Sequence, residues 1–462
     1  MVELADVVVV SNRGPLSFSH GPSGRLEVRR AAGGLVVTLG AGVLAAGALW
    51  IGAALSEADR QAAGEGVVEH NGFRSRSLVL DNDDYRSYYD VVANGALWYA
   101  LHGLWDLPRR PRFDRHWHQA WAQYEKVNAQ FVTAVAEAAA PGATVLVQDY
   151  HLALVPAALA AQRPDLRIAM FLHTPWCAPT ELSVLPETVT TAILEGMAGD
   201  GLPVGFHSQR WARAFEACCR ELLGRPASTF VAPAAPDADD TIGVARSAAC
   251  DAALGDLEAY LGDRRFVVRA DRIEMSKNIL RGFHAFDELL ETRPELRGKV
   301  VFGAFLYPSR TGLADYLAYG QEVVALARLI NEKWGADDWT PVLVDTNDDY
   351  PRSVAAMRRA DVILVNPVRD GLNLVAKELA LVNERNGVLV LSERAGATDE
   401  LGAHALVINP FDVSATAEAL GSALDMDPAQ RASRAKGLHK AVCARAPEDW
   451  FADLVRAAQG GA

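Results

Sequence analysis

Residues 369–378 hold the side chains whose types and spacing most clearly suggest chemistry. The segment reads Arg369-Asp370-Gly371-Leu372-Asn373-Leu374-Val375-Ala376-Lys377-Glu378 and follows the aliphatic run 362–365. An aliphatic run between polar residues predicts a strand that is buried on both faces of a parallel sheet. We expect a tight turn at Gly371 and a helix from about Leu372, whose first backbone N–H groups would bind an anion such as a diphosphate.

Two carboxylates flank this predicted helix start. Asp370 could accept hydrogen bonds from sugar hydroxyls, and Glu378, about two turns further on, could bind a ribose diol. Together with the diphosphate position, these carboxylates suit a nucleotide sugar. The same residues would also suit a capped helix with solvated charges, and this segment does not decide between the two interpretations.

A second cluster, residues 269–278, favours the nucleotide sugar. It follows the strand-like run 266–268 and carries Arg272 and Lys277, five positions apart. These two cations could neutralise a nucleoside diphosphate, which is the leaving group in sugar transfer and gains charge in the transition state. Either cation alone would more readily be interpreted as a surface charge.

Further motifs extend this pattern along the chain. They are Val7-Val8-Val9-Val10-Ser11-Asn12-Arg13-Gly14-Pro15, Gly33-Gly34-Leu35, Asn94-Gly95-Ala96-Leu97-Trp98, Val147-Gln148-Asp149-Tyr150-His151, Leu172-His173-Thr174-Pro175-Trp176, Tyr307-Pro308-Ser309-Arg310 and Asn409-Pro410-Phe411-Asp412. With these motifs in this order, nearly the whole chain resembles retaining glycosyltransferases of the trehalose-6-phosphate synthase type, which form glycosyltransferase family 20. One motif would be weak evidence, whereas the ordered set is specific.

Short aliphatic runs alternate with helical stretches and predict an α/β fold with parallel sheets. We expect strands near 7–10, 49–53, 143–147, 168–172, 266–269, 300–304, 342–344, 362–365, 388–391 and 406–408, and a long helix near 117–139. At 462 residues, the chain exceeds the usual size of one core. The resemblance implies the GT-B architecture, two doubly wound, Rossmann-like parallel-sheet domains that face each other across a cleft.

The expected domains are an acceptor-binding domain over 1–240 and a donor-binding domain over 241–445. Residues 446–462 would form a C-terminal helix that, by the resemblance, packs back on the first domain. Residues 224–240 are rich in Ala, Pro and Asp and form the best linker candidate. Within them, 230–240 departs from the Gly-Ile/Val-Asp type of segment that the family usually carries at the crossing between its domains.

Composition limits the partners. The formal charge of −13 argues against a nucleic-acid surface. Residues 31–55 carry no charge and are long enough for a membrane span, but six glycines and a division into a helix near 34–44 and a strand near 49–53 favour buried elements. Five cysteines without CxxC spacing, and no signal-peptide pattern, predict a cytoplasmic protein. We expect small-molecule substrates and no membrane partner. The sequence does not decide the oligomeric state, and a homo-oligomer stays open.

The resemblance implies roles for individual residues on the acceptor side. Arg13 and Arg310 match positions that meet the acceptor phosphate. The chemistry agrees with these roles, because guanidinium groups bind phosphate bidentately. The acceptor positions are Arg13, Trp50, Tyr89, Trp98, Asp149 and Arg310. Without the resemblance, Tyr89 and Trp98 would be interpreted as core aromatics.

On the donor side, His173 matches the residue that touches the donor hexose; alone, it would be interpreted as a buried histidine. The donor positions are Gly33, Gly34, Arg272, Lys277, Asp370, Gly371, Leu372, Asn373, Leu374, Val375 and Glu378. The implied reaction retains the anomeric configuration by front-face attack, in which the leaving phosphate helps to deprotonate the incoming hydroxyl. Catalysis would fall to Arg272, Lys277, His173 and Asp149, with Asp149 as a positioning residue.

Several alternatives stay open. Asp149 and His151 could suggest a metal pair, but no third ligand is evident. Asp81-Asn82-Asp83 or Asp237-Ala238-Asp239 could suggest a GT-A metal site, but both are short patterns in acidic loops, so we expect no metal and no cofactor. A pseudo-glycosyltransferase that joins a nucleotide-activated cyclitol to an amino-cyclitol phosphate would share these motifs. A catalytically silent sugar-phosphate sensor is a third interpretation. The sequence does not choose between GDP-glucose and UDP-glucose as donor.

Overall fold

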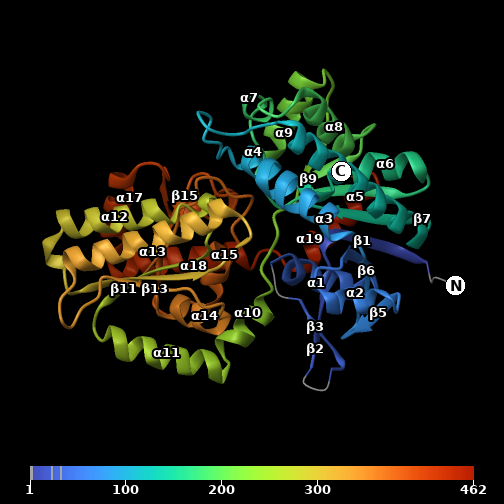
Figure 1. Ribbon diagram of the computed structural model, residues 1–462. Coiled ribbons are helices and arrows are strands. Elements are labelled where there is room, and N and C mark those ends of the chain that lie inside the picture. The colour runs from blue at the N-terminus through green and yellow to red at the C-terminus, as the bar shows by residue number, and fades with distance from the viewer. Residues whose placement is uncertain (1–3, 22–23, 32–33, 462) are drawn as a thin grey trace. The chain divides into compact units, whose positions relative to one another are not determined.

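The computed structural model describes residues 4–21, 24–31 and 34–461 (Figure 1). The chain divides into two compact units. One unit combines Met1–Ala234 with Pro447–Ala462, and the other is Ala235–Ala446. The boundaries expected from the sequence are 240 and 445.

Within the described residues, the first unit holds an eight-stranded sheet in the order β10-β9-β8-β7-β1-β4-β6-β5. Its strands are β1 (Ala5–Arg13), β4 (Leu49–Ala53), β5 (Val67–His70), β6 (Phe73–Leu78), β7 (Ala139–Gln148), β8 (Arg167–Leu172), β9 (Pro203–Phe206) and β10 (Ser228–Val231). Neighbouring strands are parallel except β5 and β6. Because β1 is the first strand and lies in the middle, the strand order reverses between β1 and β7.

Helices complete the first unit. They are α1 (Gly34–Ala45), α2 (Glu57–Ala63), α3 (Asn82–Arg86), the π-helix η1 (Ser87–Leu97), α4 (Trp98–His102), α5 (Arg115–Ala138), η2 (Tyr150–Leu152), α6 (Val155–Gln162), α7 (Pro179–Leu182), α8 (Glu187–Ala198), α9 (Gln209–Leu222) and α19 (Pro447–Ala458). The C-terminal helix α19 packs on α1 and on the strands β7 and β8, with Trp450 fully buried. Residues 31–55 thus contain a helix and a strand of the core, and across the described ranges no helix is long and apolar enough to cross a bilayer.

The second unit holds, in its described part, a six-stranded parallel sheet in the order β13-β12-β11-β14-β15-β16. The strands are β11 (Arg265–Arg272), β12 (Val300–Tyr307), β13 (Val342–Asp345), β14 (Val362–Val365), β15 (Val388–Ser392) and β16 (Leu406–Ile408). Numbered along the chain, this order is 3-2-1-4-5-6, which is the doubly wound order of dinucleotide-binding folds. The strand order reverses between β11 and β14.

Helices again connect these strands. They are α10 (Ala238–Ala245), α11 (Ala248–Leu261), η3 (Met275–Lys277), α12 (Ile279–Thr292), η4 (Pro294–Leu296), α13 (Ala314–Trp334), α14 (Tyr350–Arg359), α15 (Val375–Val382), α16 (Thr398–Leu401), η5 (Gly402–His404), α17 (Val413–Asp425) and α18 (Pro428–Val442). The aliphatic side chains of β14 are buried, as a strand covered on both faces requires. The strands expected from the sequence are all present in both units.

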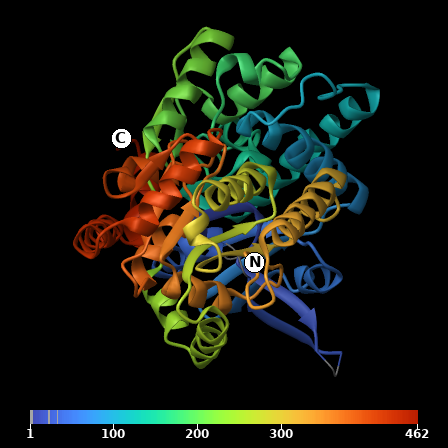
Figure 2. The same ribbon diagram turned by 90° about the vertical axis from the view of Figure 1, so that its left-hand side faces the viewer.

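Three features differ from the expectation. The proposed linker 224–240 contains the edge strand β10, because Ser228–Val231 pairs in parallel with β9. The antiparallel pair β5–β6 and the hairpin of β2 (Leu16–His20) and β3 (Leu26–Arg30) were not predicted, since their short, partly polar runs lack a strong apolar pattern. The β2–β3 hairpin projects from the first unit in both views (Figures 1 and 2).

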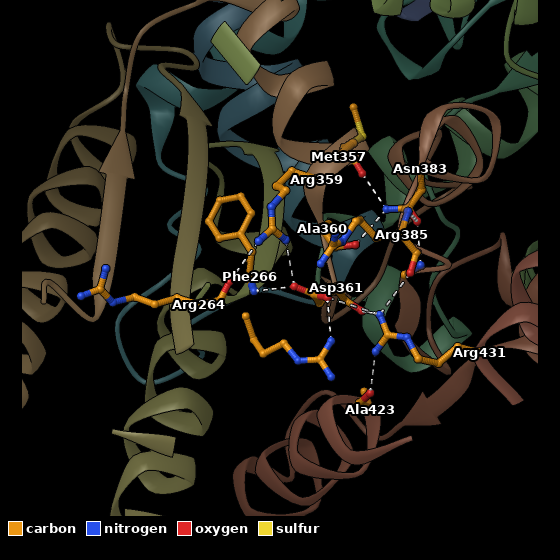
Figure 3. A network of polar contacts seen from close by, with 12 residues as sticks. Arg264, Phe266, Met357, Arg359, Ala360, Asp361, Asn383, Arg385, Ala423 and Arg431 are labelled. Carbon is orange, nitrogen blue, oxygen red and sulfur yellow. Dashed lines mark hydrogen bonds and ion pairs between the residues drawn. The ribbon is translucent and has the colours of Figure 1, made fainter. Parts of the chain in front are cut away.

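A buried carboxylate joins three arginines at the start of β14 (Figure 3). Asp361 is 1% exposed, and its side chain accepts hydrogen bonds from Arg265, from Arg359 and from the backbone N–H of Phe266 at 2.9, 3.1 and 3.0 Å. Arg431 of α18 lies 3.7 Å from the same carboxylate and donates to the Asp361 carbonyl oxygen at 2.8 Å. This network fastens β11, β14 and α18 to each other at the N-terminal ends of the two strands.

Asp361→Ala should destabilise the protein by about 3–5 kcal/mol, because it leaves buried guanidinium groups without their counter-charge. Urea denaturation followed by circular dichroism measures the shift of the unfolding midpoint. Asp338→Ala is the matched control, since the Asp338 side chain is 86% exposed and pairs with Arg264 at 3.4 Å. It should cost less than about 1 kcal/mol. Equal shifts for the two variants would contradict this account of the network.

Candidate active site

Four of the residues expected to carry chemistry lie where a sheet reverses its strand order. In the second unit, Arg272 ends β11 and Asp370 follows β14. In the first unit, Arg13 ends β1 and Asp149 follows β7. In doubly wound sheets, ligands bind at the carboxyl ends of the strands at such switch points, because the connections there diverge to opposite faces. Topology therefore places a candidate site in each unit.

In the second unit, an ion pair joins the two predicted donor-binding segments, 269–278 and 369–378. Lys277 Nζ lies 2.6 Å from Asp370 Oδ2, which also accepts a hydrogen bond from Asn373 Nδ2 at 3.1 Å. Burial lowers the pKa of Lys277, but the carboxylates of Asp370, Asp271 and Glu274 outweigh burial, so that the net direction of the pKa is upward. Lys277 therefore stays charged and can neutralise a phosphate group.

Arg269, for which no role was expected from the sequence, binds the backbone of this lysine. Its side chain is fully buried. The guanidinium donates to Asp271 at 2.7 Å, to Asn366 at 3.2 Å and to the carbonyl oxygen of Lys277 at 2.8 Å. Arg269 thus links the ends of β11 and β14 to the turn that carries Lys277. An arginine within a run of apolar strand residues was the signal in the sequence, because such a charge must be paired when it is buried.

Glu274 shares its charge between the two arginines assigned to substrate phosphates. Its side chain is 3% exposed, and Oε1 lies 3.1 Å from Arg272 Nε and 3.8 Å from Arg310 Nη1. The same oxygen accepts a hydrogen bond from Ser309 Oγ at 3.2 Å, and Arg310 also hydrogen bonds to the Tyr316 hydroxyl. One buried carboxylate therefore orients both the predicted donor arginine and the predicted acceptor arginine.

The turn after β14 differs from the expectation. The helix begins at Val375 and not near Leu372, and the residue with positive φ is Asn373 (79°) and not Gly371. The reason is a backbone pairing with residues 394–397, in which Asp370 N–H donates to Arg394 at 3.1 Å and Ala397 N–H donates to Leu372 at 2.8 Å. Asn373 Oδ1 then accepts from Ala376 N–H at 3.1 Å and caps the helix start.

Because α15 starts later, Glu378 lies in its first turn and not two turns into the helix. Burial raises the pKa of the Glu378 carboxyl to about 7, and the charge of Asp240 on α10 acts in the same direction. Burial also raises the pKa of the neighbouring Tyr307 hydroxyl to about 12. The hydrogen bond of this hydroxyl to Ser353 Oγ at 2.6 Å lowers the pKa, but by less than burial raises it. Glu378 thus changes its charge near neutral pH.

In the first unit, Asp149 occupies a strained position directly after β7. Its φ of 71° is rare for a residue with a side chain. The Asp149 N–H donates to the Phe171 carbonyl at 2.8 Å, and Oδ2 lies 4.0 Å from His151 Nδ1. Among the described non-glycine residues, positive φ occurs at six positions, and four of them fall in segments singled out from the sequence: Asp149, Asn278, Arg310 and Asn373. Such strain concentrates at functional sites.

A stack of rings lies beside Asp149. Tyr89 stacks on Tyr85 and on His151 with centroid distances of 5.4 and 5.5 Å, and His151 stacks on Tyr150 at 4.1 Å. Tyr85 and Tyr89 come from α3 and the π-helix η1, and π-helical turns occur frequently at functional sites. Asn12 at the end of β1 donates to the Tyr85 hydroxyl at 3.0 Å. The partly buried Tyr89 ring is therefore held rigidly next to Asp149.

The remaining predicted residues of the first unit differ in exposure. Arg13 is exposed at the end of β1. Trp50 is fully buried and donates from Nε1 to Ser11 Oγ at 2.8 Å, and Trp98 is 2% exposed and stacks on His102 at 4.3 Å. Gly34 begins α1, whereas Gly33 lies outside the described residues. The acceptor roles of the two tryptophans remain predictions.

His173 follows β8 and is held as a neutral ring. Its Nε2 lies 2.9 Å from Gln148 Oε1 at the end of β7. Burial lowers the pKa of His173 to about 3. The ring packs against Phe171 and Trp450 at centroid distances of 5.2 and 5.7 Å. At physiological pH, His173 therefore offers a neutral hydrogen-bonding group.

This neutral ring should make the protein less stable in acid. The unfolded chain takes up the proton at a pKa of about 6.5, whereas the folded chain resists it down to about 3, so stability falls as the pH drops below about 6.5. His173 should account for a loss of about 2 kcal/mol between about pH 7.5 and about pH 5. Urea denaturation at several pH values should show that His173→Gln loses this part of the slope. The exposed-residue control His284→Gln should keep it, and an unchanged slope in both variants would contradict the expectation.

Comparisons with known proteins bear on this geometry. The family model described as glycosyltransferase family 20 matches residues 5–460. A trehalose-6-phosphate synthase of Mycobacterium sp. (strain KMS) is 34% identical, with 99% of this chain and 96% of that protein covered. Among solved structures, the E. coli protein bound with UDP-2-fluoro glucose is 28% identical with a TM-score of 0.83, and covers 97% of this chain and 99% of that chain.

A second solved structure is the trehalose-phosphate synthase (UDP-forming) of Burkholderia xenovorans in complex with glucose-6-phosphate. It is 29% identical with a TM-score of 0.84, and the match covers 98% of this chain and 100% of that chain. Both the sequence matches and the structural matches thus extend over nearly the full length and include both doubly wound units. The chain therefore belongs to glycosyltransferase family 20, and it is a trehalose-6-phosphate synthase-like glycosyltransferase with the GT-B fold.

Proposed function

We propose that the chain transfers glucose from a nucleotide-glucose donor to glucose 6-phosphate, with retention at the anomeric carbon, to form trehalose 6-phosphate. The observation that carries this proposal is the cluster of Arg272, Lys277 and Asp370 at the strand reversal of the second unit. It supplies two cations for a diphosphate and a carboxylate for sugar hydroxyls. The relatives named as trehalose-6-phosphate synthases support the same reaction.

UDP-glucose is the donor that we propose to test first, with GDP-glucose second. The support comes from the relatives, since one solved structure holds a UDP-linked fluorinated glucose and another belongs to a UDP-forming enzyme. The residues of this chain that bear on the nucleotide are Glu378, whose carboxylate would accept hydrogen bonds from the ribose hydroxyls, and the nearby Asp240.

The chemistry then rests on placement and charge. The acceptor hydroxyl attacks the anomeric carbon on the face of the leaving diphosphate, and a phosphate oxygen takes the hydroxyl proton. Arg272 and Lys277 stabilise the charge that develops on the leaving group. We propose that His173 and Asp149 hold the sugars in place, which lowers the barrier by orientation and not by proton transfer. We propose no metal ion, because the two cations supply the charge that a metal would otherwise provide.

The direct test is nucleoside diphosphate release from UDP-glucose and from GDP-glucose, with and without glucose 6-phosphate and with EDTA present throughout. Release that requires the acceptor, together with a disaccharide phosphate in the mass spectrum, supports the proposal and names the donor. Donor binding without turnover would overturn it. An amino-cyclitol phosphate should then be assayed as acceptor, because a pseudo-glycosyltransferase would use it.

Substitutions at Arg310 and at Glu274 should distinguish an effect on the acceptor alone from an effect on both substrates. Arg310→Ala should raise the KM for glucose 6-phosphate at least about tenfold and change the KM for the donor by less than about twofold. Glu274→Gln should raise both KM values, because Glu274 Oε1 orients both Arg272 and Arg310. Steady-state kinetics with each substrate varied measures both constants. Equal losses on donor and acceptor in Arg310→Ala would count against the acceptor role.

Donor affinity should fall in mild acid. The Glu378 carboxyl has a pKa of about 7 in the free protein, and ribose hydroxyls would bind its ionised form, so the Kd of the nucleotide sugar should rise as the pH falls below about 7. Calorimetry should find up to about tenfold weaker binding per pH unit below about 7. The intact nucleotide sugar is the required probe, because its phosphate groups stay ionised in this range. Glu378→Gln should bind more weakly with a flat pH profile, and a flat profile in the wild type would refute the assignment.

A further inference from the structure

His207 connects His173 to the segment in which the chain leaves the first unit. Its Nε2 lies 3.2 Å from His173 Nδ1, and its Nδ1 accepts a hydrogen bond from the backbone N–H of Ala234 at 3.3 Å. Ala234 is the last residue of the first unit before the chain enters the second. With the His173 contact to Gln148, this makes a continuous chain of hydrogen bonds from the end of β7 to the crossing segment.

The direction of this chain fixes both histidine tautomers. A backbone N–H can only donate, so His207 Nδ1 carries a lone pair and the proton of the neutral ring sits on Nε2. That proton points to His173 Nδ1, which must therefore accept. The remaining proton of His173 is on Nε2, which donates a hydrogen bond to the side-chain oxygen Oε1 of Gln148. Within this chain of hydrogen bonds, each ring nitrogen thus has one role.

Apolar packing leaves the two rings little freedom. His207 is 5% exposed and meets the Phe171 ring at 4.8 Å in an edge arrangement. Trp450 of α19 lies against both histidines, at centroid distances of 5.7 Å from His173 and 6.2 Å from His207. Since α19 begins at the second boundary between the units, residues adjacent to both boundaries contact this histidine pair.

We propose that His207 is a positioning residue for sugar transfer: it holds His173 as a neutral Nε2–H donor and makes the placement of that donor depend on the Ala234 crossing segment. This inference rests on the proposed role of His173 at the donor hexose. When the sugar arrives, one of its oxygens replaces Gln148 Oε1 as acceptor of the Nε2 proton. A displacement of Ala234 would alter the His207 hydrogen bonds and thereby the direction of that N–H group.

Two substitutions at His207 test the proposal kinetically. His207→Gln keeps both functions, because the amide oxygen can accept from Ala234 N–H and the amide nitrogen can donate to His173 Nδ1. His207→Phe keeps a ring of similar size and removes both hydrogen bonds. We expect His207→Phe to lower kcat at least about tenfold with the KM for glucose 6-phosphate unchanged, and His207→Gln to stay within about threefold of the wild type. Equal activity in the two variants, whether high or low, would overturn the proposal.

A measurement without turnover keeps the inference separate from the proposed reaction. In the full-length protein with ¹⁵N-labelled histidine, long-range ¹H–¹⁵N spectra report the tautomer of each ring, and His173→Gln identifies the His173 signals. We expect a protonated Nε2 and an unprotonated Nδ1 on His173 in the wild type, and exchange between tautomers in His207→Phe. The opposite tautomer in the wild type would overturn the inference even in an active enzyme. If the wild type transfers no glucose, the proposed function fails while this spectrum still decides the tautomer.

Discussion

The ion pair between Lys277 and Asp370 holds the candidate donor site together. Its partners lie 93 residues apart in the sequence, at the ends of the two strands between which the sheet of the second unit reverses its order. Together with the hydrogen bonds of Arg269, the ion pair ties the connections after β11 and β14, which lead to opposite faces of the sheet, to each other. Asp370 also accepts from Asn373, so the same pair helps to keep the left-handed turn that starts α15. The position of Glu378 in the first turn of that helix follows from this turn and from the backbone pairing of 370–372 with 394–397.

A second constraint is that the cations of the site are paired before any substrate binds. Lys277 has Asp370, and Arg272 and Arg310 have the single buried carboxylate of Glu274. Pairing offsets the repulsion between cations that have been taken out of water. It also means that an incoming phosphate competes with an existing partner, and the more exposed Arg272, with 57% of its side chain accessible, can give up that partner at the smallest cost. The donor diphosphate would therefore bind first at Arg272, while the less exposed Lys277 keeps its partner Asp370.

Local sequence predicted the elements better than their ends. The strands followed from aliphatic runs such as 362–365, because burial on both faces is a property of the run itself. The start of α15 was wrong by three residues, since the backbone of 370–372 pairs with 394–397, and no local pattern indicates such a distant pairing. The positive φ of Asn373 and the π-helix over Ser87–Leu97 were likewise not predicted from the sequence. For the site, motif spacing selected segments that the fold brings to the carboxyl ends of the strands. The contacts of Arg269 and His207 needed the three-dimensional structure, because a charged or polar side chain in a sequence does not show what it is paired with.

The segment 230–240 departs from the family pattern, yet its residues make definite contacts in both units. Ala234 donates its N–H to His207, and Asp240 on α10 helps to raise the pKa of the Glu378 carboxyl. Asp237 caps α10 through a hydrogen bond to the Asp240 N–H at 3.0 Å, which fixes where that helix starts. A segment that had merely lost a former function would have no reason to keep a capped helix next to the predicted ribose carboxylate and a hydrogen bond to the histidine pair. The altered sequence is therefore better explained as a different means of linking the crossing to the donor-side residues than as the mark of a silent relative.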